Sequence, residues 1–174
     1  VHIPVVMTES GLTEVVYNDF YIGEDADVVI VAGCGISNCG GADSKHDGIH
    51  AFHVKKGSKV RYIEKHYGEG TGSGKRLMNP TTEVELEEGA SMEMDTSQIA
   101  GINDTLRITR AKLKENASLV IRDKILTDGE QTARAEMIVE LNGDGSSCDL
   151  VSRGVAKGSS TQEVKIGIDG NAVC

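Results

Sequence analysis

The residues best suited to metal chemistry gather in one polar, glycine-rich stretch near the N-terminus. Two cysteines form the pattern Cys34-x4-Cys39, and three histidines follow in the order His46-x3-His50-x2-His53. Thiolate and imidazole are ligands that hold iron, zinc or copper, so a metal site is one interpretation of this stretch, although the spacing matches no standard zinc-finger pattern. The alternative interpretation is a hydrogen-bonded loop in which His50 and His53 face opposite ways and Cys34 fills the core as a small apolar group.

Further cysteines and one more candidate histidine stand outside that stretch. Cys148 follows two serines at an expected corner of the chain, and it reaches a metal site only if the fold aligns it with the first cysteines. His66 lies on an alternating segment, where we expect a solvated or partly buried side chain. Together with Cys174 the chain has four cysteines, too few for a disulfide framework. We therefore expect free thiols in a reducing, cytoplasmic compartment.

Two glycine-rich segments resemble nucleotide-binding turns but lack essential residues. The pattern G-x-G-x-x-G fails after Gly33, because its third glycine would fall at Asn38. The segment 68–75 resembles a phosphate-binding loop, but Glu69 takes the place of its first glycine and Arg76 replaces the Ser or Thr that binds magnesium. We expect no nucleotide site here and interpret 68–75 as a flexible loop.

The overall composition argues against several classes of protein. The chain carries 27 acidic and 18 basic residues, and a net charge of -9 repels nucleic acid and anionic lipid. No apolar run approaches the roughly 18 residues that a membrane span needs. Paired acids such as Asp43 and Asp47 would permit sugar hydrolysis. Sugar-binding clefts usually contain aromatic platforms, however, and this chain has no tryptophan, four tyrosines and two phenylalanines.

A seven-residue unit recurs along the chain and indicates a solenoid. Each copy begins with an apolar residue, continues with polar residues and a Gly, Asn or Asp, and usually ends on an apolar residue. The first four intervals are 32, 32, 27 and 28 residues, as in known solenoid repeats. Gly57, Gly89 and Asn116 are residue types that accept positive φ, so each is expected at a tight corner. The copies start at Ile22, Val54, Leu86 and Leu113, with weaker ones at Leu141 and Val155.

The segments after the corners alternate apolar and polar residues. Examples are 117–122 and 135–141, and this period of two predicts strands with one buried face. The segment 105–115 also permits a short helix, but the alternation at 106–109 favours a strand. Strands at near-regular intervals without intervening helices predict an all-β protein, a parallel β-helix that forms one domain over residues 1–174.

Several runs of residues resemble the SufB/SufD family, particularly its short, stand-alone members. The resemblance covers nearly the whole chain and implies a right-handed parallel β-helix. It implies a scaffold component of the Suf iron-sulfur cluster assembly machinery, not an enzyme, that works with a SufC-type ABC ATPase. It also implies a homodimer or a SufB/SufD heterodimer. The runs are 17–23 (YNDFYIG), 31–36 (VAGCGI), 46–50 (HDGIH), 60–70 (VRYIEKHYGEG), 78–80 (MNP) and 151–157 (VSRGVAK).

The resemblance further implies that part of the family's architecture is missing. The chain begins at Val1 without a methionine and stops at Cys174 without a terminating pattern, so we interpret it as a fragment. The family's C-terminal coils and the helical segment on which its ATPase docks then lie elsewhere, and an iron-sulfur cluster needs residues beyond this chain. The alternatives are a carbohydrate-active β-solenoid enzyme and a polymerising structural β-solenoid. In this portion, any metal-ligand role is assigned to Cys34, Cys39, His46, His50 and His53, followed by Cys148.

Overall fold

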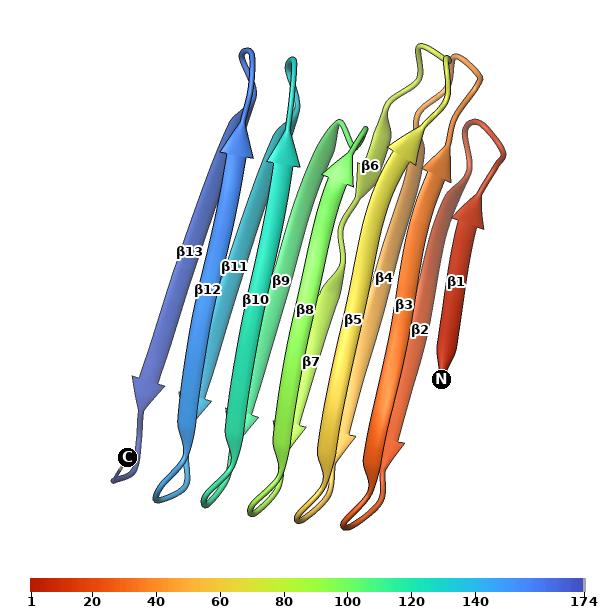
Figure 1. Ribbon diagram of the computed structural model, residues 1–174. Coiled ribbons are helices and arrows are strands. Elements are labelled where there is room, and N and C mark those ends of the chain that lie inside the picture. The colour runs from red at the N-terminus through yellow and green to blue at the C-terminus, as the bar shows by residue number, and fades with distance from the viewer. Residues whose placement is uncertain (174) are drawn as a thin grey trace.

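The chain winds through two facing parallel sheets and forms a right-handed β-solenoid of about six turns (Figure 1). This computed structural model describes residues 1–173, and Cys174 lies outside them. Every regular element in the described part is a strand, and the two ends of the chain lie at opposite ends of the coil. None of the described residues forms a helix long and apolar enough to cross a membrane.

Each turn of the chain contributes one strand to each sheet, except that the third turn supplies two short strands, β6 and β7, to the second sheet. The first sheet has the order β1 (His2–Met7), β3 (Asp27–Ser37), β5 (Lys59–Glu69), β8 (Ser91–Ala100), β10 (Ser118–Thr127) and β12 (Ser147–Ala156). The second contains β2 (Thr13–Ile22), β4 (Ser44–Val54), β6 (Arg76–Met78), β7 (Thr81–Leu86), β9 (Asp104–Leu113), β11 (Thr132–Leu141) and β13 (Thr161–Gly170). The segment 105–115, for which a helix was the alternative, lies mostly in strand β9.

The predicted corners are confirmed. Gly57, Gly89 and Asn116 have φ angles of 68, 66 and 54 degrees, which place them in the left-handed region that a tight corner requires. The corners also stack, since the backbone N–H of Gly57 donates to the carbonyl of Glu88, 3.0 Å away, in the next coil. The repeated unit therefore sets both the bend and the contact between neighbouring coils.

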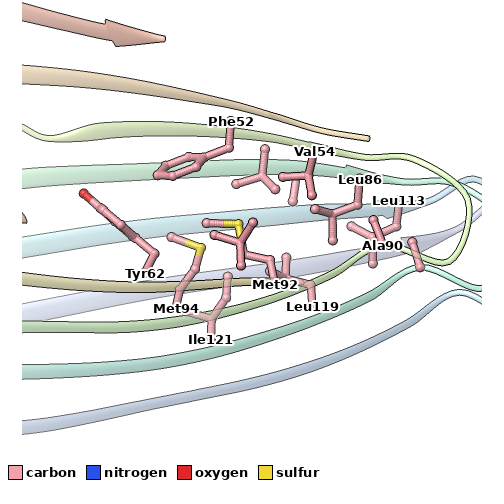
Figure 2. Close-up of a cluster of buried hydrophobic side chains, with 14 of the residues drawn as sticks. Phe52, Val54, Tyr62, Leu86, Ala90, Met92, Met94, Leu113, Leu119 and Ile121 are labelled. Atoms are coloured by element: carbon pink, nitrogen blue, oxygen red, sulfur yellow. The ribbon is translucent and has the colours of Figure 1, made fainter. Parts of the chain in front are cut away.

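Equivalent inward positions of neighbouring coils stack into rows. Tyr62, Met94 and Ile121 occupy the same register of β5, β8 and β10, and all three are buried (Figure 2). Rows of this kind fill the part of the interior next to the 57, 89 and 116 corners with aliphatic side chains, methionines and two aromatic rings. This apolar part of the core stabilises the coil by removing apolar surface from water.

The next rows of the first sheet are polar although they are equally buried. Two positions beyond Tyr62, the register aligns Glu64, Thr96 and Asp123. All three have at most 4% of their surface exposed. Arg107 of the second sheet is also buried and reaches across the interior to Asp123. A buried charge is costly unless it is paired, so this polar layer of the interior is the natural place for a functional site.

The glycine-rich segment 68–75 begins in strand β5 and continues as a loop that packs on the loop of the preceding coil. The N–H of Gly72 donates to the carbonyl of Asn38 and that of Gly74 to the carbonyl of Gly40, each at 3.1 Å. A Cβ atom on either glycine would overlap the backbone of the preceding loop. The glycines are therefore required for loops of successive coils to stack backbone against backbone.

Candidate metal centre

Cys34, Glu64 and His66 bring three different metal-binding groups together inside the solenoid. Cys34 on β3 and His66 on β5 are direct neighbours in register, and Glu64 precedes His66 by one inward position. One ligand atom from each lies within 4.8 Å of the other two, and all three residues are buried. Alternation places Glu64 and His66 on the same face of one strand, and the register places Cys34 beside them.

The orientation of His66 is set by Arg107 from the opposite sheet. Arg107 Nη2 lies 3.0 Å from His66 Nδ1, and a guanidinium can only donate, so Nδ1 is the acceptor. The ring proton is then on Nε2, which lies 3.2 Å from Glu64 Oε1 without a well-directed hydrogen bond. To ligate an ion through Nε2, His66 must give up this proton and release Arg107, which also donates to Asp123 and Thr96.

Glu64 supplies the buried negative charge of the group. The Tyr62 hydroxyl donates to Glu64 Oε1 at 2.8 Å, and His50 Nε2 lies 3.7 Å from the same oxygen. Burial alone would raise the pKa of Glu64, but His66, Arg107 and His50 outweigh it and hold that pKa well below 4.5. Burial lowers the pKa of His50, against the opposing charge of Glu64, so its imidazole favours the neutral, ligating form.

Cys34 is a protonated thiol in the absence of a bound cation. Burial, together with the charges of Glu64 and Glu14, raises the pKa of Cys34 to about 12. Only a thiolate ligates a metal, so binding at Cys34 would release a proton. Such a thiol is unreactive toward most reagents but is available to a cation that supplies positive charge next to the sulfur.

The donor set fits a single metal ion better than a whole cluster. Two ligands held at about 2.0–2.3 Å from one ion lie roughly 3–4.6 Å apart, which agrees with the 4.8 Å limit of this group. Thiolate, imidazole and carboxylate together suit iron or zinc. Iron-sulfur clusters are usually held by four ligands that are mostly thiolates, and Cys34 is the one thiol of this group.

The structure separates the cysteines that the sequence analysis considered together. Cys34 is buried in the candidate centre, whereas Cys39 is exposed in the loop that follows β3. Cys148 on β12 aligns with Leu119 and packs against the main apolar core. Burial and the nearby charge of Asp149 raise the pKa of Cys148 to about 11. Neither Cys39 nor Cys148 belongs to the group around Glu64.

The three histidines of β4 are divided between the two faces of the strand. His46 and His50 point inward and are buried, while His53 is on the outer face, where it lies 3.3 Å from Glu85 and stacks on Tyr21. The hydrogen-bonded-loop interpretation anticipated the opposite orientation of His50 and His53, but the loop itself was wrong, because both residues lie on strand β4. His50 approaches the candidate centre through Glu64, and His53 does not.

Two members of the centre were not predicted as ligands from the sequence. His66 was expected to be solvated or partly buried, and this was wrong, because only 1% of its surface is exposed. Glu64 was not considered as a ligand. The available signal was the strand 60–66, where Tyr62, Glu64 and His66 share one face. Ile63 on the other face is also apolar, so the alternation did not reveal which face was buried.

Comparison with known proteins places the chain in one family. A family model described as "SUF system FeS cluster assembly, SufBD core domain" matches residues 38–173. An iron-sulfur cluster assembly SufBD family protein of Methanocaldococcus jannaschii is 27% identical over 173 residues, which cover 99% of this chain and 54% of that protein. The chain thus spans about half the length of this curated relative. No solved structure matches it significantly.

Proposed function

We propose, since the chain belongs to the SufBD core-domain family, that it forms the β-helical part of a scaffold on which iron-sulfur clusters are assembled. Membership of this family connects the chain to iron-sulfur cluster assembly and favours the scaffold over the two alternatives, a carbohydrate-active enzyme and a polymerising solenoid. The proposal assigns the chain no catalytic turnover of its own. Its partners are a SufC-type ABC ATPase and a second SufB- or SufD-like chain.

The observation that carries the proposal is the buried group of Cys34, Glu64 and His66. Glu64 and His66 lie within the matched core domain, and Cys34 lies shortly before it. In an assembly scaffold iron is cargo, and this group offers a thiol, a carboxylate and an imidazole to one ferrous ion. Glu64 offsets the positive charge of the ion, and Cys34 gives up a proton as it binds. Arg107 holds the His66 ring through Nδ1 and releases it when Nε2 ligates the ion.

Anaerobic binding of ferrous iron, followed by Mössbauer spectroscopy, tests the proposed centre. The chain should bind iron with a signal that shows sulfur among the ligands, and Cys34→Ala should remove the sulfur contribution. Cys39→Ala is the matched control, because Cys39 is exposed and stands outside the centre. Equal spectra for wild type and Cys34→Ala would eliminate the centre.

The partnership is tested separately on the full-length protein. Sedimentation with a purified SufC-type ATPase should give a complex larger than either component. Sedimentation of the protein alone should give a dimer at micromolar concentration. A monomer that stays unchanged on addition of the ATPase would contradict the proposed partners while leaving the iron centre untouched.

A further inference from the structure

Two buried imidazoles converge above Gly48 on the inner face of β4. His46, Gly48 and His50 are successive inward residues of this strand. A Cβ atom on Gly48 would stand 3.3 Å from His46 Nε2 and 3.2 Å from His50 Nε2. Because glycine has no side chain, both ring nitrogens border the same space.

His46 is oriented so that its free nitrogen faces that space. Its Nδ1 lies 3.0 Å from Glu14 Oε2 on the neighbouring strand β2, so the carboxylate holds the tautomer with the proton on Nδ1. The lone pair is then on Nε2. Only 2% of the His46 surface is exposed, and Nε2 has no hydrogen-bond partner within residues 1–173. A metal-ligating histidine usually donates one ring N–H to a carboxylate and uses its other ring nitrogen to bind the metal.

His50 forms the other side of the space and connects it to the candidate centre. Its ring stacks on Phe20, with the centroids 6.1 Å apart and the planes 6 degrees from parallel. Its Nε2 lies 3.7 Å from Glu64 Oε1, and its Nδ1 has no partner among the described residues. The ring is thus held by packing, and its nitrogens are not committed to other protein groups.

We propose that His46 and His50 bind a second divalent metal ion in the space above Gly48, beside the Cys34, Glu64 and His66 centre. The ion is a borderline transition metal such as ferrous iron or cobalt, because imidazole nitrogens select these ions over magnesium or calcium. That the natural ion is iron rests on the proposed function, whereas the site itself rests on the geometry of β4. With two protein ligands, this ion binds more weakly than the one at the three-ligand centre.

Cobalt(II) distinguishes the two ions, because a cobalt–thiolate bond gives a strong charge-transfer absorption that cobalt–imidazole bonds lack. Equilibrium dialysis with metal analysis should find two cobalt ions on each wild-type chain, with the charge-transfer band. His46→Ala should retain one ion and the band. Cys34→Ala should retain one ion and lose the band. Gly48→Ala should bind one ion, because its methyl group occupies the space.

Matched controls separate loss of the site from general damage. Gly33→Ala also adds a methyl group to a strand glycine, but its nearest atom is 3.9 Å away, so two ions should remain. His53→Ala removes an outward imidazole of the same strand and should also leave two. His46→Gln keeps most of the side-chain volume and should lose one ion. Circular dichroism and thermal unfolding check each variant, and only those that retain the wild-type spectrum are compared.

Several results would overturn the second site. One cobalt ion on wild type with the band present refutes it and leaves the cysteine centre standing. Two ions on both His46→Gln and Gly48→Ala refute it as well. Two ions on wild type, without the band and with one lost in His46→Gln, would support the second site and refute the ligand role of Cys34.

Discussion

Replacing Asp123 with asparagine removes one charge from the interior and leaves its partner in place. Asp123 is 1% exposed and forms an ion pair with Arg107, which is 4% exposed. Its carboxylate also accepts hydrogen bonds from Thr96 at 2.7 Å and from Ser152 at 3.3 Å. Asparagine has nearly the same volume, so the change tests charge and hydrogen bonding with little effect on packing.

The expected cost follows from the burial of Arg107. A guanidinium stays charged, so after the change it remains in the interior without its carboxylate. Removing one partner of a buried ion pair costs about 3–5 kcal/mol, and the remaining contacts of Arg107 with Thr96 and His66 favour the lower end, about 3 kcal/mol. With a urea slope of about 2 kcal/mol per molar, the unfolding midpoint should fall by about 1.5 M.

The control is an exposed ion pair that includes Arg122, the residue before Asp123 on the same strand. Arg122 faces outward and pairs with Glu93 at 2.6 Å, with both side chains 48% exposed. Glu93→Gln should therefore cost less than about 1 kcal/mol. The double variant Arg107→Met and Asp123→Leu removes both charges and should recover most of the loss. Urea unfolding followed by circular dichroism measures the free energy of unfolding of each of these variants. A cost for Asp123→Asn as small as that of Glu93→Gln would refute the inference that a paired charge is buried here.

Three other properties of the chain can be tested directly. An alkylating reagent at pH 8 should modify exposed Cys39 at least roughly tenfold faster than Cys34, whose pKa burial raises to about 12; timed mass spectrometry measures both rates, and equal rates would contradict the buried thiol. Glu64→Gln should lower the unfolding free energy by a constant amount above about pH 5, and the difference should shrink below pH 4.5, because the folded-state pKa of Glu64 lies below the unfolded one. Urea unfolding at pH 3 and pH 6 checks this, and the same difference at both would be inconsistent with a depressed pKa. Gly101→Ala should lower the free energy of unfolding in urea by at least about 2 kcal/mol more than Gly89→Ala. Both glycines have positive φ, but only a methyl group at Gly101 would overlap the backbone of a neighbouring turn. Similar losses for the two variants would argue against the stacked turns.

Much of the fold could be predicted because its determinants are local. The corners at Gly57, Gly89 and Asn116 depend on which residue types accept positive φ, and this property belongs to the residue itself. The strands depend on alternation between adjacent residues, and the β-helix on the interval between corners. Three of the inward candidates, Cys34, His46 and His50, were recognised by residue type alone.

The composition of the candidate centre depends on which coil lies beside which, and no local pattern specifies that. Cys34 meets His66 because β3 and β5 pair in one particular register, and a shift by one residue would turn the His66 side chain to the outer face. Arg107 reaches His66 from the other sheet, across an interior that exists only after the coil has closed. Residue types and spacing therefore specify the bends and the strands. Proximity between residues distant in sequence arises from the stacking of whole coils, which the packing of all the rows determines together.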